Sequence, residues 1–182
     1  MIKIHDNVFD QKWIIELSSQ LLKEGWTANN VANRNTFPYQ ESGTHRLLGK
    51  TFFLRQGHDN IIYDHTNMNL CQNLINAFDH IRRISDTNMQ LMDITCNLKF
   101  KDKDRTFHRD CIKNQKAFIL MLNNEQLPKN IGGAFIHKPT NKKVPFEAGR
   151  LIEITANDLH RAYMKLVHKF NSLFVKMIRK IM

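Results

Sequence analysis

Phe107-His108-Arg109-Asp110 places an imidazole and a carboxylate two residues apart. On an extended strand, residues i and i+2 point to the same side, so His108 and Asp110 can converge on one point. A second histidine from elsewhere would complete a set of two imidazoles and one carboxylate. Such a set holds a transition metal from one face and leaves other coordination positions open. Because a short His-x-Asp motif also arises by chance, the surrounding sequence must supply further support.

The sequence around this motif alternates between short apolar runs and polar turns. One run, Leu91–Phe100, precedes the motif, and four follow it: Lys116–Asn123, Ala134–His137, Leu151–Thr155 and Asn171–Ile178. Short strands separated by polar turns are typical of an all-β sandwich or barrel. The second half of the chain is therefore predicted to form a β-core.

The first half of the chain carries helical patterns instead. Ile2–His5 alternates like a short strand, and Asp10 can cap a helix whose apolar residues recur at helical spacing over residues 13–22. A second helix is predicted over residues 68–84, with its apolar side chains on one face. These helices are amphipathic, so each needs a partner surface to cover.

The polar, irregular residues 26–60 are expected to form loops, with one strand at Thr51–Arg55. Because helices come first and strands follow, we predict an α+β fold with the N-terminal helices packed outside the β-core. The length of 182 residues suits one domain. The change in pattern near residue 86 then separates supporting elements (1–86) from the β-core (87–182) within a single domain, 1–182.

Composition excludes several classes of protein. Hydrophobic residues make up 42% of the chain, which is enough to fill a core and argues against global disorder. No apolar run approaches the roughly 20 residues that span a bilayer, and no signal peptide is expected at the N-terminus. The three cysteines are widely spaced and odd in number, so neither a disulfide framework nor a structural zinc site is expected. We therefore expect a cytoplasmic protein without a membrane partner.

Positive charge is concentrated in the second half of the chain. The formal net charge is +10, and residues 161–182 contain six basic residues and no acidic residue. This excess favours solubility and a general attraction to polyanions, or else a specific anionic substrate or nucleic acid. Composition does not separate these two interpretations.

Further motifs downstream of His-x-Asp follow a recognisable order. They are Met121-Leu122-Asn123, Gly132-Gly133-Ala134-Phe135, the Pro145–Leu151 stretch with its Pro-x-x-x-Gly-x-Leu pattern, and Asp158-Leu159-His160-Arg161. Over residues 88–178 this series resembles the 2-oxoglutarate/Fe(II) dioxygenase superfamily, in particular its prolyl-4-hydroxylase-like branch and the short members encoded by bacteriophages. The resemblance implies a double-stranded β-helix, the jelly-roll or cupin-like core of that superfamily.

The resemblance also implies the metal ligands. His108, Asp110 and His160 match the positions of the iron ligands in the family. His137 is the competing histidine for the third position, but it falls just after the two glycines, where the family has no ligand. His160 is preferred because it follows the 149–154 strand as the family ligand does, and His137 is expected to be an exposed loop or strand residue.

The family further requires a cation for the distal carboxylate of 2-oxoglutarate, about ten residues after the distal histidine. Lys169 is the best match, with Arg161 and Lys165 as alternatives. A lysine there departs from the arginine common in the branch, and its point charge lacks the planar fork that clamps a carboxylate. Asn97 occupies the strand before the motif and is a second candidate for binding the cosubstrate.

The activity implied by the resemblance is a dioxygenase reaction with Fe(II), 2-oxoglutarate and O2, in which 2-oxoglutarate is decarboxylated to succinate. The presence of a carboxylate at Asp110 favours hydroxylation over halogenation. The branch implies a protein or peptide substrate, as for a prolyl hydroxylase, and a phage-like protein would act in the host cytoplasm. Two alternatives stay open: a nucleic-acid-directed dioxygenase of the same superfamily, and a catalytically inactive β-barrel binding module. The oligomeric state is not predicted.

Overall fold

The computed structural model describes residues 1–30, 47–56, 60–85, 89–99, 107–110, 115–123, 133–163 and 172–181. Over these ranges the chain forms two α-helices, α1 (Gln11–Leu22) and α3 (Met68–Ile84), and the short 3-10 helix η1 (His65–Asn67). The strands in the same ranges are β1 (Lys3–His5), β2 (Thr27–Asn30), β3 (Leu47–Gln56), β4 (Asn60–Tyr63), β5 (Met89–Lys99), β6 (Lys116–Leu122), β7 (Ala134–His137), β8 (Lys142–Pro145), β9 (Leu151–Thr155), β10 (His160–Tyr163) and β11 (Ser172–Ile181).

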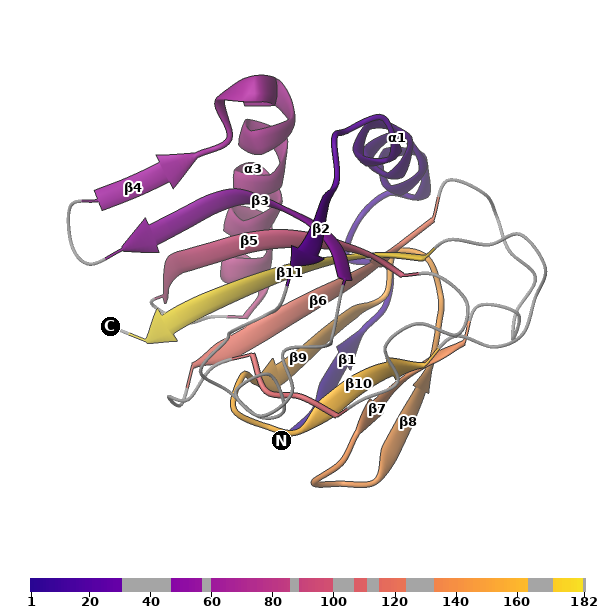
Figure 1. Ribbon diagram of the computed structural model, residues 1–182. Helices are drawn as coiled ribbons and strands as arrows, with labels where there is room; N and C mark the ends of the chain where they lie inside the picture. The colour runs from indigo at the N-terminus through magenta and orange to yellow at the C-terminus, as the bar shows by residue number, and fades with distance from the viewer. Residues whose placement is uncertain are drawn as a thin grey trace.

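The strands form two antiparallel sheets. The larger sheet has the order β1-β9-β6-β11-β5-β3-β2, with β4 paired beside β3, and the smaller sheet has the order β10-β7-β8. Figure 1 shows α1 and α3 on one side of the larger sheet and the smaller sheet on the other. The larger sheet is therefore the middle layer, which confirms the prediction of helices packed outside a β-core.

Local sequence explains where both helices begin. The Asp10 carboxylate accepts hydrogen bonds from the backbone N–H groups of Lys12 and Trp13 at the start of α1. At the start of α3, the Asn67 side chain accepts one from the backbone N–H of Leu70. Such caps satisfy N–H groups that have no partner inside a helix. Both predicted helices are confirmed.

Apolar side chains fill the spaces on both sides of the larger sheet. One core lies between this sheet and the helices, and its largest fully buried members include Ile14, Leu21, Phe52, Leu70, Leu74, Ile81, Ile94, Phe118 and Leu120. A second core lies between the sheets and comprises Ala117, Ile119, Met121, Phe135, Val144, Phe146, Ile152, Ile154 and Ala156. Alternate side chains of β6 point into the two cores. Because both faces of the strand are buried, its sequence is continuously apolar.

The strands predicted at the N-terminus and in the second half are present, with shifts of a few residues at their ends. The strand predicted at Thr51–Arg55 is confirmed within the longer β3, but the expectation of loops elsewhere in 26–60 is wrong in part, because β2 lies there and β4 begins at Asn60; residues 31–46 and 57–59 fall outside the described ranges. Strands β8 and β10 were not predicted. Both have only four residues; β8 pairs with β7 across the short turn 138–141, and β10 pairs with β7 from more than 20 residues away.

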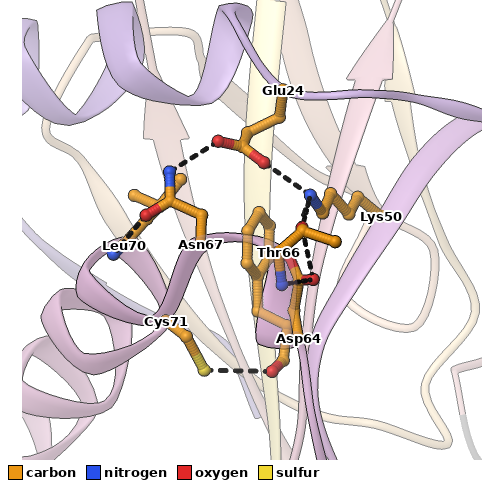
Figure 2. A network of polar contacts seen from close by, with 8 residues as sticks. Glu24, Lys50, Asp64, Thr66, Asn67, Leu70 and Cys71 are labelled. Atoms are coloured by element: carbon orange, nitrogen blue, oxygen red, sulfur yellow. Dashed lines mark hydrogen bonds and ion pairs between the residues drawn. The ribbon is translucent and has the colours of Figure 1, made fainter.

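A charged cluster ties α1, β3 and the start of α3 together. Lys50 on β3 lies 2.5 Å from Glu24 Oε2 and 2.8 Å from Asp64 Oδ2, and it donates to Thr66 Oγ1 at 3.0 Å. Asn67 Nδ2 donates to the other oxygen of Glu24 at 2.7 Å. Figure 2 shows Lys50 between the two carboxylates. Burial alone would lower the pKa of Lys50, but its hydrogen bonds with Asp64 and Glu24 outweigh that effect and raise it.

In the part of the chain that the structure describes, no helix is both long enough and apolar enough to cross a membrane.

Candidate metal centre

Three side chains from two distant parts of the sequence meet at one point. The ligand atoms of His108, Asp110 and His160 all lie within 4.8 Å of one another. His108 Nε2 lies 3.6 Å from Asp110 Oδ1, and His160 Nε2 lies 3.3 Å from Asp110 Oδ2. The three residues are buried, with exposed fractions of 8%, 3% and 3%. The structure therefore brings together the set that the sequence suggested as metal ligands.

Backbone pairing positions the two histidines. The His108 N–H donates to the His160 carbonyl at 2.9 Å, and the His160 N–H donates back to the His108 carbonyl at 3.0 Å. Directly opposed residues in an antiparallel pair point to the same face, and the two ring centroids lie 4.5 Å apart. The motif forms a single bridge here instead of the extended strand that the i, i+2 spacing suggested. Asp110 is held separately, because its N–H donates to the Ala156 carbonyl at 2.9 Å.

Phe135 on β7 also contacts the site. It is buried in the core between the sheets, and its ring stacks on the His160 ring at a centroid distance of 5.3 Å. The sequence placed Phe135 in a family motif without assigning it a role. No local signal would have identified this contact, because it depends on the pairing of β7 with β10.

The hydrogen bond at Nδ1 fixes the protonation of the His160 ring. Nδ1 lies 2.8 Å from the backbone carbonyl of Asp158. A carbonyl oxygen only accepts, so Nδ1 carries the proton and Nε2 of the neutral ring keeps its lone pair. That lone pair faces the Asp110 carboxylate, whose Oδ2 lies 3.3 Å from Nε2.

An unprotonated Nε2 and a carboxylate oxygen at this separation repel each other unless a proton or a metal cation lies near both. A second imidazole, His108, is within reach of the same point. Two imidazoles and one carboxylate form the facial set that suits Fe(II), with positions left open. The donor chemistry of these three residues therefore fits a divalent iron ion.

His137 does not compete for the metal. It is fully buried, with 0% exposure, so the expectation of an exposed residue is wrong. His137 lies directly opposite His160 in the pairing of β7 with β10. Its Nδ1 lies 2.8 Å from Thr140 Oγ1 and its Nε2 lies 3.0 Å from Asp158 Oδ2. Both ring nitrogens thus have protein partners, which supports the choice of His160 as the third ligand.

The basic residues considered for the cosubstrate carboxylate can be placed only in part. Lys169 and Lys165 lie outside the described residues. Arg161 follows His160 on β10, and its guanidinium Cζ lies 4.5 Å from the centroid of the Phe107 ring. Strand alternation predicts that neighbouring residues face opposite sides, and this position argues against Arg161 as a cosubstrate ligand.

Asn97 lies on the face of β5 that is turned toward the smaller sheet. Its neighbours Cys96 and Leu98 belong to the core beneath the helices, and alternation along the strand places Asn97 on the opposite face. The residue is half-buried and lies opposite Gly49 of β3 in register. Asn97 therefore lies on the face of the larger sheet opposite the helices.

Comparisons with known proteins place this geometry in context. Neither the protein-family models nor the curated protein sequences gave a match. Solved structures do match. An oxidoreductase of the 2OG-Fe(II) oxygenase family from Burkholderia pseudomallei has a TM-score of 0.69 and 12% identity, over 98% of this chain and 85% of that chain. The chain has the fold of the 2OG-Fe(II) oxygenases.

Two other structures show the range of proteins that share this fold. The viral collagen prolyl hydroxylase of Paramecium bursaria Chlorella virus-1, solved as a 2-oxoglutarate complex, has a TM-score of 0.57 and 11% identity, over 100% of this chain and 96% of that chain. NgTET1, solved with DNA containing 5mC, has a TM-score of 0.59 and 10% identity, over 97% of this chain and 70% of that chain. The 2OG-Fe(II) oxygenase fold is thus used on both protein and DNA substrates.

Proposed function

We propose that this protein is a non-haem Fe(II)- and 2-oxoglutarate-dependent dioxygenase that hydroxylates a protein or peptide side chain. The observation that carries the proposal is the buried His108–Asp110–His160 cluster, within a fold shared with 2OG-Fe(II) oxygenases. A domain that had lost catalysis would be free to lose any one of these three ligands. All three are present and converge, which favours an active enzyme over an inactive binding module.

The residues of the site would each have a defined task. His108 and His160 would bind Fe(II) through imidazole nitrogens, and Asp110 would supply the carboxylate. The bound iron, with 2-oxoglutarate and O2, would supply the oxidation of a C–H bond coupled to release of succinate and CO2. The burial of the three ligands keeps bulk water from the metal, and the Asp158 carbonyl holds the His160 ring in the tautomer that a metal ligand needs.

We infer that Lys169 binds the distal carboxylate of 2-oxoglutarate and that Asn97 donates a hydrogen bond to the same cosubstrate. Asn97 has support from its place on the inner face of β5. The core strands are interpreted as a double-stranded β-helix, with β9, β6, β11 and β5 in one layer and β10, β7 and β8 in the other. In this interpretation residues 1–182 form one domain that acts in the cytoplasm, in a host cell if the protein is phage-like.

A nucleic acid is the second candidate for the substrate. The net charge of +10 and the shared fold with NgTET1 on DNA favour it. A peptide is preferred because the match to the viral collagen prolyl hydroxylase covers nearly the whole of both chains, whereas NgTET1 is matched over 70% of its length. The segment after His160 also lacks the Arg-x-Asn-x-x-x-x-Arg pattern of nucleic-acid demethylases.

The test is formation of succinate by purified protein loaded anaerobically with Fe(II) and then given 2-oxoglutarate and O2. The wild type should release succinate slowly without a prime substrate, and Asp110→Ala should release none above background. Asp79→Ala is a matched control, because Asp79 is an exposed aspartate on α3, far from the cluster along the chain. Circular dichroism should show that all three proteins are folded. Equal background rates in the wild type and Asp110→Ala would refute the assignment.

Proline-containing peptides and single-stranded DNA should then be added in turn. Stimulation of succinate formation by a peptide, with a mass increase of one oxygen atom on that peptide, would support the preferred substrate class. Stimulation by DNA alone would replace it with the nucleic-acid alternative.

A further inference from the structure

The turn between β9 and β10 accepts hydrogen bonds from two of the three metal ligands, Asp110 and His160, and from Arg109. Three consecutive backbone carbonyls accept them. The Ala156 carbonyl accepts from the Asp110 N–H at 2.9 Å, the Asn157 carbonyl accepts from Arg109 Nε at 3.0 Å, and the Asp158 carbonyl accepts from His160 Nδ1 at 2.8 Å. Asp110 and His160 therefore share this turn as a hydrogen-bond partner, whereas His108 pairs with the His160 backbone.

His137 forms a hydrogen bond with the side chain of Asp158 in this turn. Its Nε2 lies 3.0 Å from Asp158 Oδ2, and because a carboxylate accepts, the imidazole donates. Thr140 Oγ1 lies 2.8 Å from Nδ1 and fixes the second edge of the ring. His137 is wholly buried in β7, whereas the Asp158 side chain is 23% exposed. Of His137 and Asp158, the histidine is thus the more buried residue.

Other contacts of Asp158 are weaker restraints. The N-terminal ammonium of Met1 lies 3.5 Å from the same carboxylate oxygen, but it is 86% exposed, and a pair of this kind contributes little. The backbone bond from the Asp158 N–H to the Thr155 carbonyl at 2.9 Å closes the turn but does not orient its side chain. Among these described contacts, the hydrogen bond from His137 is the buried one that fixes the Asp158 side chain.

We propose that His137 is a positioning residue for the metal centre and acts on His160 through Asp158. Its hydrogen bond holds the Asp158 carboxylate, so that the carbonyl of the same residue stays aimed at His160 Nδ1. The His160 ring then keeps both its orientation and the tautomer with a lone pair on Nε2. The inference rests on the proposed function, because it requires that His160 bind a metal. Loss of a group that hydrogen-bonds a metal ligand directly typically lowers metal affinity by about 10–100-fold, and His137 acts one residue farther from the ligand.

The test uses Co(II) as a spectroscopic substitute for Fe(II), titrated into metal-free protein without 2-oxoglutarate. The variant His137→Phe fills a similar volume but cannot donate, and it should bind Co(II) up to about 10-fold more weakly than the wild type, the lower end of the range for a direct partner. The variant His137→Gln keeps an N–H donor at the end of its side chain and should restore most of the affinity. The visible d–d bands of the bound Co(II) should change in His137→Phe and return toward wild type in His137→Gln.

Two further variants keep the proposal falsifiable if His137→Phe does not fold. Asp158→Ala removes the partner carboxylate from a partly exposed position and should reproduce the loss of affinity, whereas Asp158→Asn keeps an acceptor oxygen and should not. His80→Gln, on α3 with its ring nitrogen 3.1 Å from the Val8 carbonyl, is the control for loss of a histidine remote in sequence and should bind like the wild type.

The outcomes separate the two levels of inference. Absence of Co(II) and Fe(II) binding by the wild type would overturn the proposed function. Wild-type affinity and an unchanged spectrum in His137→Phe or Asp158→Ala, with the wild type binding metal, would overturn only the role of His137.

Discussion

Lys50 is the residue whose replacement should test the packing of the helices on the sheet most directly. Its ammonium group is shared by Glu24 and Asp64, and the side chains of the three residues are 14%, 11% and 9% exposed. The substitution Lys50→Met keeps an unbranched side chain of similar length and removes the charge together with the N–H donors to Glu24, Asp64 and Thr66. It therefore leaves two nearly buried carboxylates close together without their cation (Figure 2).

The expected loss of stability in Lys50→Met depends on the hydrogen bonds that Glu24 and Asp64 keep. Removing one partner of a buried ion pair typically costs about 3–5 kcal/mol. Asp64 would keep hydrogen bonds from the Thr66 N–H at 3.0 Å and from Thr66 Oγ1 at 2.6 Å, and Glu24 would keep the one from Asn67. These bonds place the loss at the lower end, about 3 kcal/mol. For a chain of this length, that loss corresponds to a fall in Tm of about 6–12 °C.

The loss should depend on pH in a defined direction. Burial by itself raises the pKa of Asp64, but hydrogen bonds from Lys50 and Thr66 reverse the effect, so the pKa lies below its usual value. Because the pKa of Asp64 is lower in the folded state, the carboxylate stabilises the wild type at pH values above the unfolded-state pKa of about 3.9. That stabilisation is lost as the pH falls through the lower pKa of the folded state. The difference between wild type and Lys50→Met should therefore shrink on acidification.

Urea unfolding of both proteins at about pH 7 and at about pH 2.5, well below the unfolded-state value, measures this difference. Arg82→Met is the matched control, because Arg82 forms an i, i+3 pair with Asp79 in which both side chains are more than 40% exposed. Its replacement should change the free energy of unfolding by less than about 0.5 kcal/mol. A loss below about 1 kcal/mol in Lys50→Met, or a loss of equal size at both pH values, would refute the reasoning.

Three further substitutions or reactions test other parts of the structure. Arg150→Lys should lower the free energy of unfolding, measured in urea at neutral pH, by about 1 kcal/mol, because it breaks the bidentate contact with Asp6. The hydrogen bond from Arg150 lowers the pKa of Asp6. The difference in stability between the two proteins should therefore shrink as the pH falls through that lowered pKa. Gly149→Ala should cost about 1–2 kcal/mol by the same measurement, since Gly149 has a φ of +88° and a Cβ there would lie 3.4 Å from Ile14 Cγ1; an unchanged midpoint would contradict it. Burial raises the pKa of the Cys96 thiol, so mass spectrometry should find Cys96 unlabelled by a disulfide reagent in native protein and labelled in denaturant.

The helices could be predicted because their signals are local. Asp10 before α1 and the apolar stripe of α3 lie within the elements that they specify, and both helices form where the pattern indicates. Strand β6 was equally clear, since burial on both faces produces a continuous apolar run. By contrast, β2 is the sequence Thr-Ala-Asn-Asn and β10 is His-Arg-Ala-Tyr. Neither has strand alternation of its own, and pairing with distant segments makes them strands.

The candidate metal centre shows the same division between local and distant information. The types and order of its three ligands were visible in the sequence, because coordination chemistry restricts them to imidazole and carboxylate. The role of the 155–158 turn was not visible, since its contribution comes from backbone carbonyls, which every residue has. His137 was misread as exposed for a related reason: only the pairing of β7 with β10 buries it beside His160.

This division bears on whether the protein is an enzyme or a binding module that kept a metal motif. The convergence of all three ligands favours an active enzyme, and residues that orient a ligand add to that evidence. His137 hydrogen-bonds to the Asp158 carboxylate, and the Asp158 carbonyl hydrogen-bonds to the ligand His160. Packing alone would be better satisfied by an apolar side chain at residue 137, because a buried polar ring requires partners on both nitrogens. His137 has Thr140 and Asp158 as those partners. Its place opposite the ligand His160 adds to the evidence from the converging ligands, and the Co(II) titration of His137→Phe tests that role.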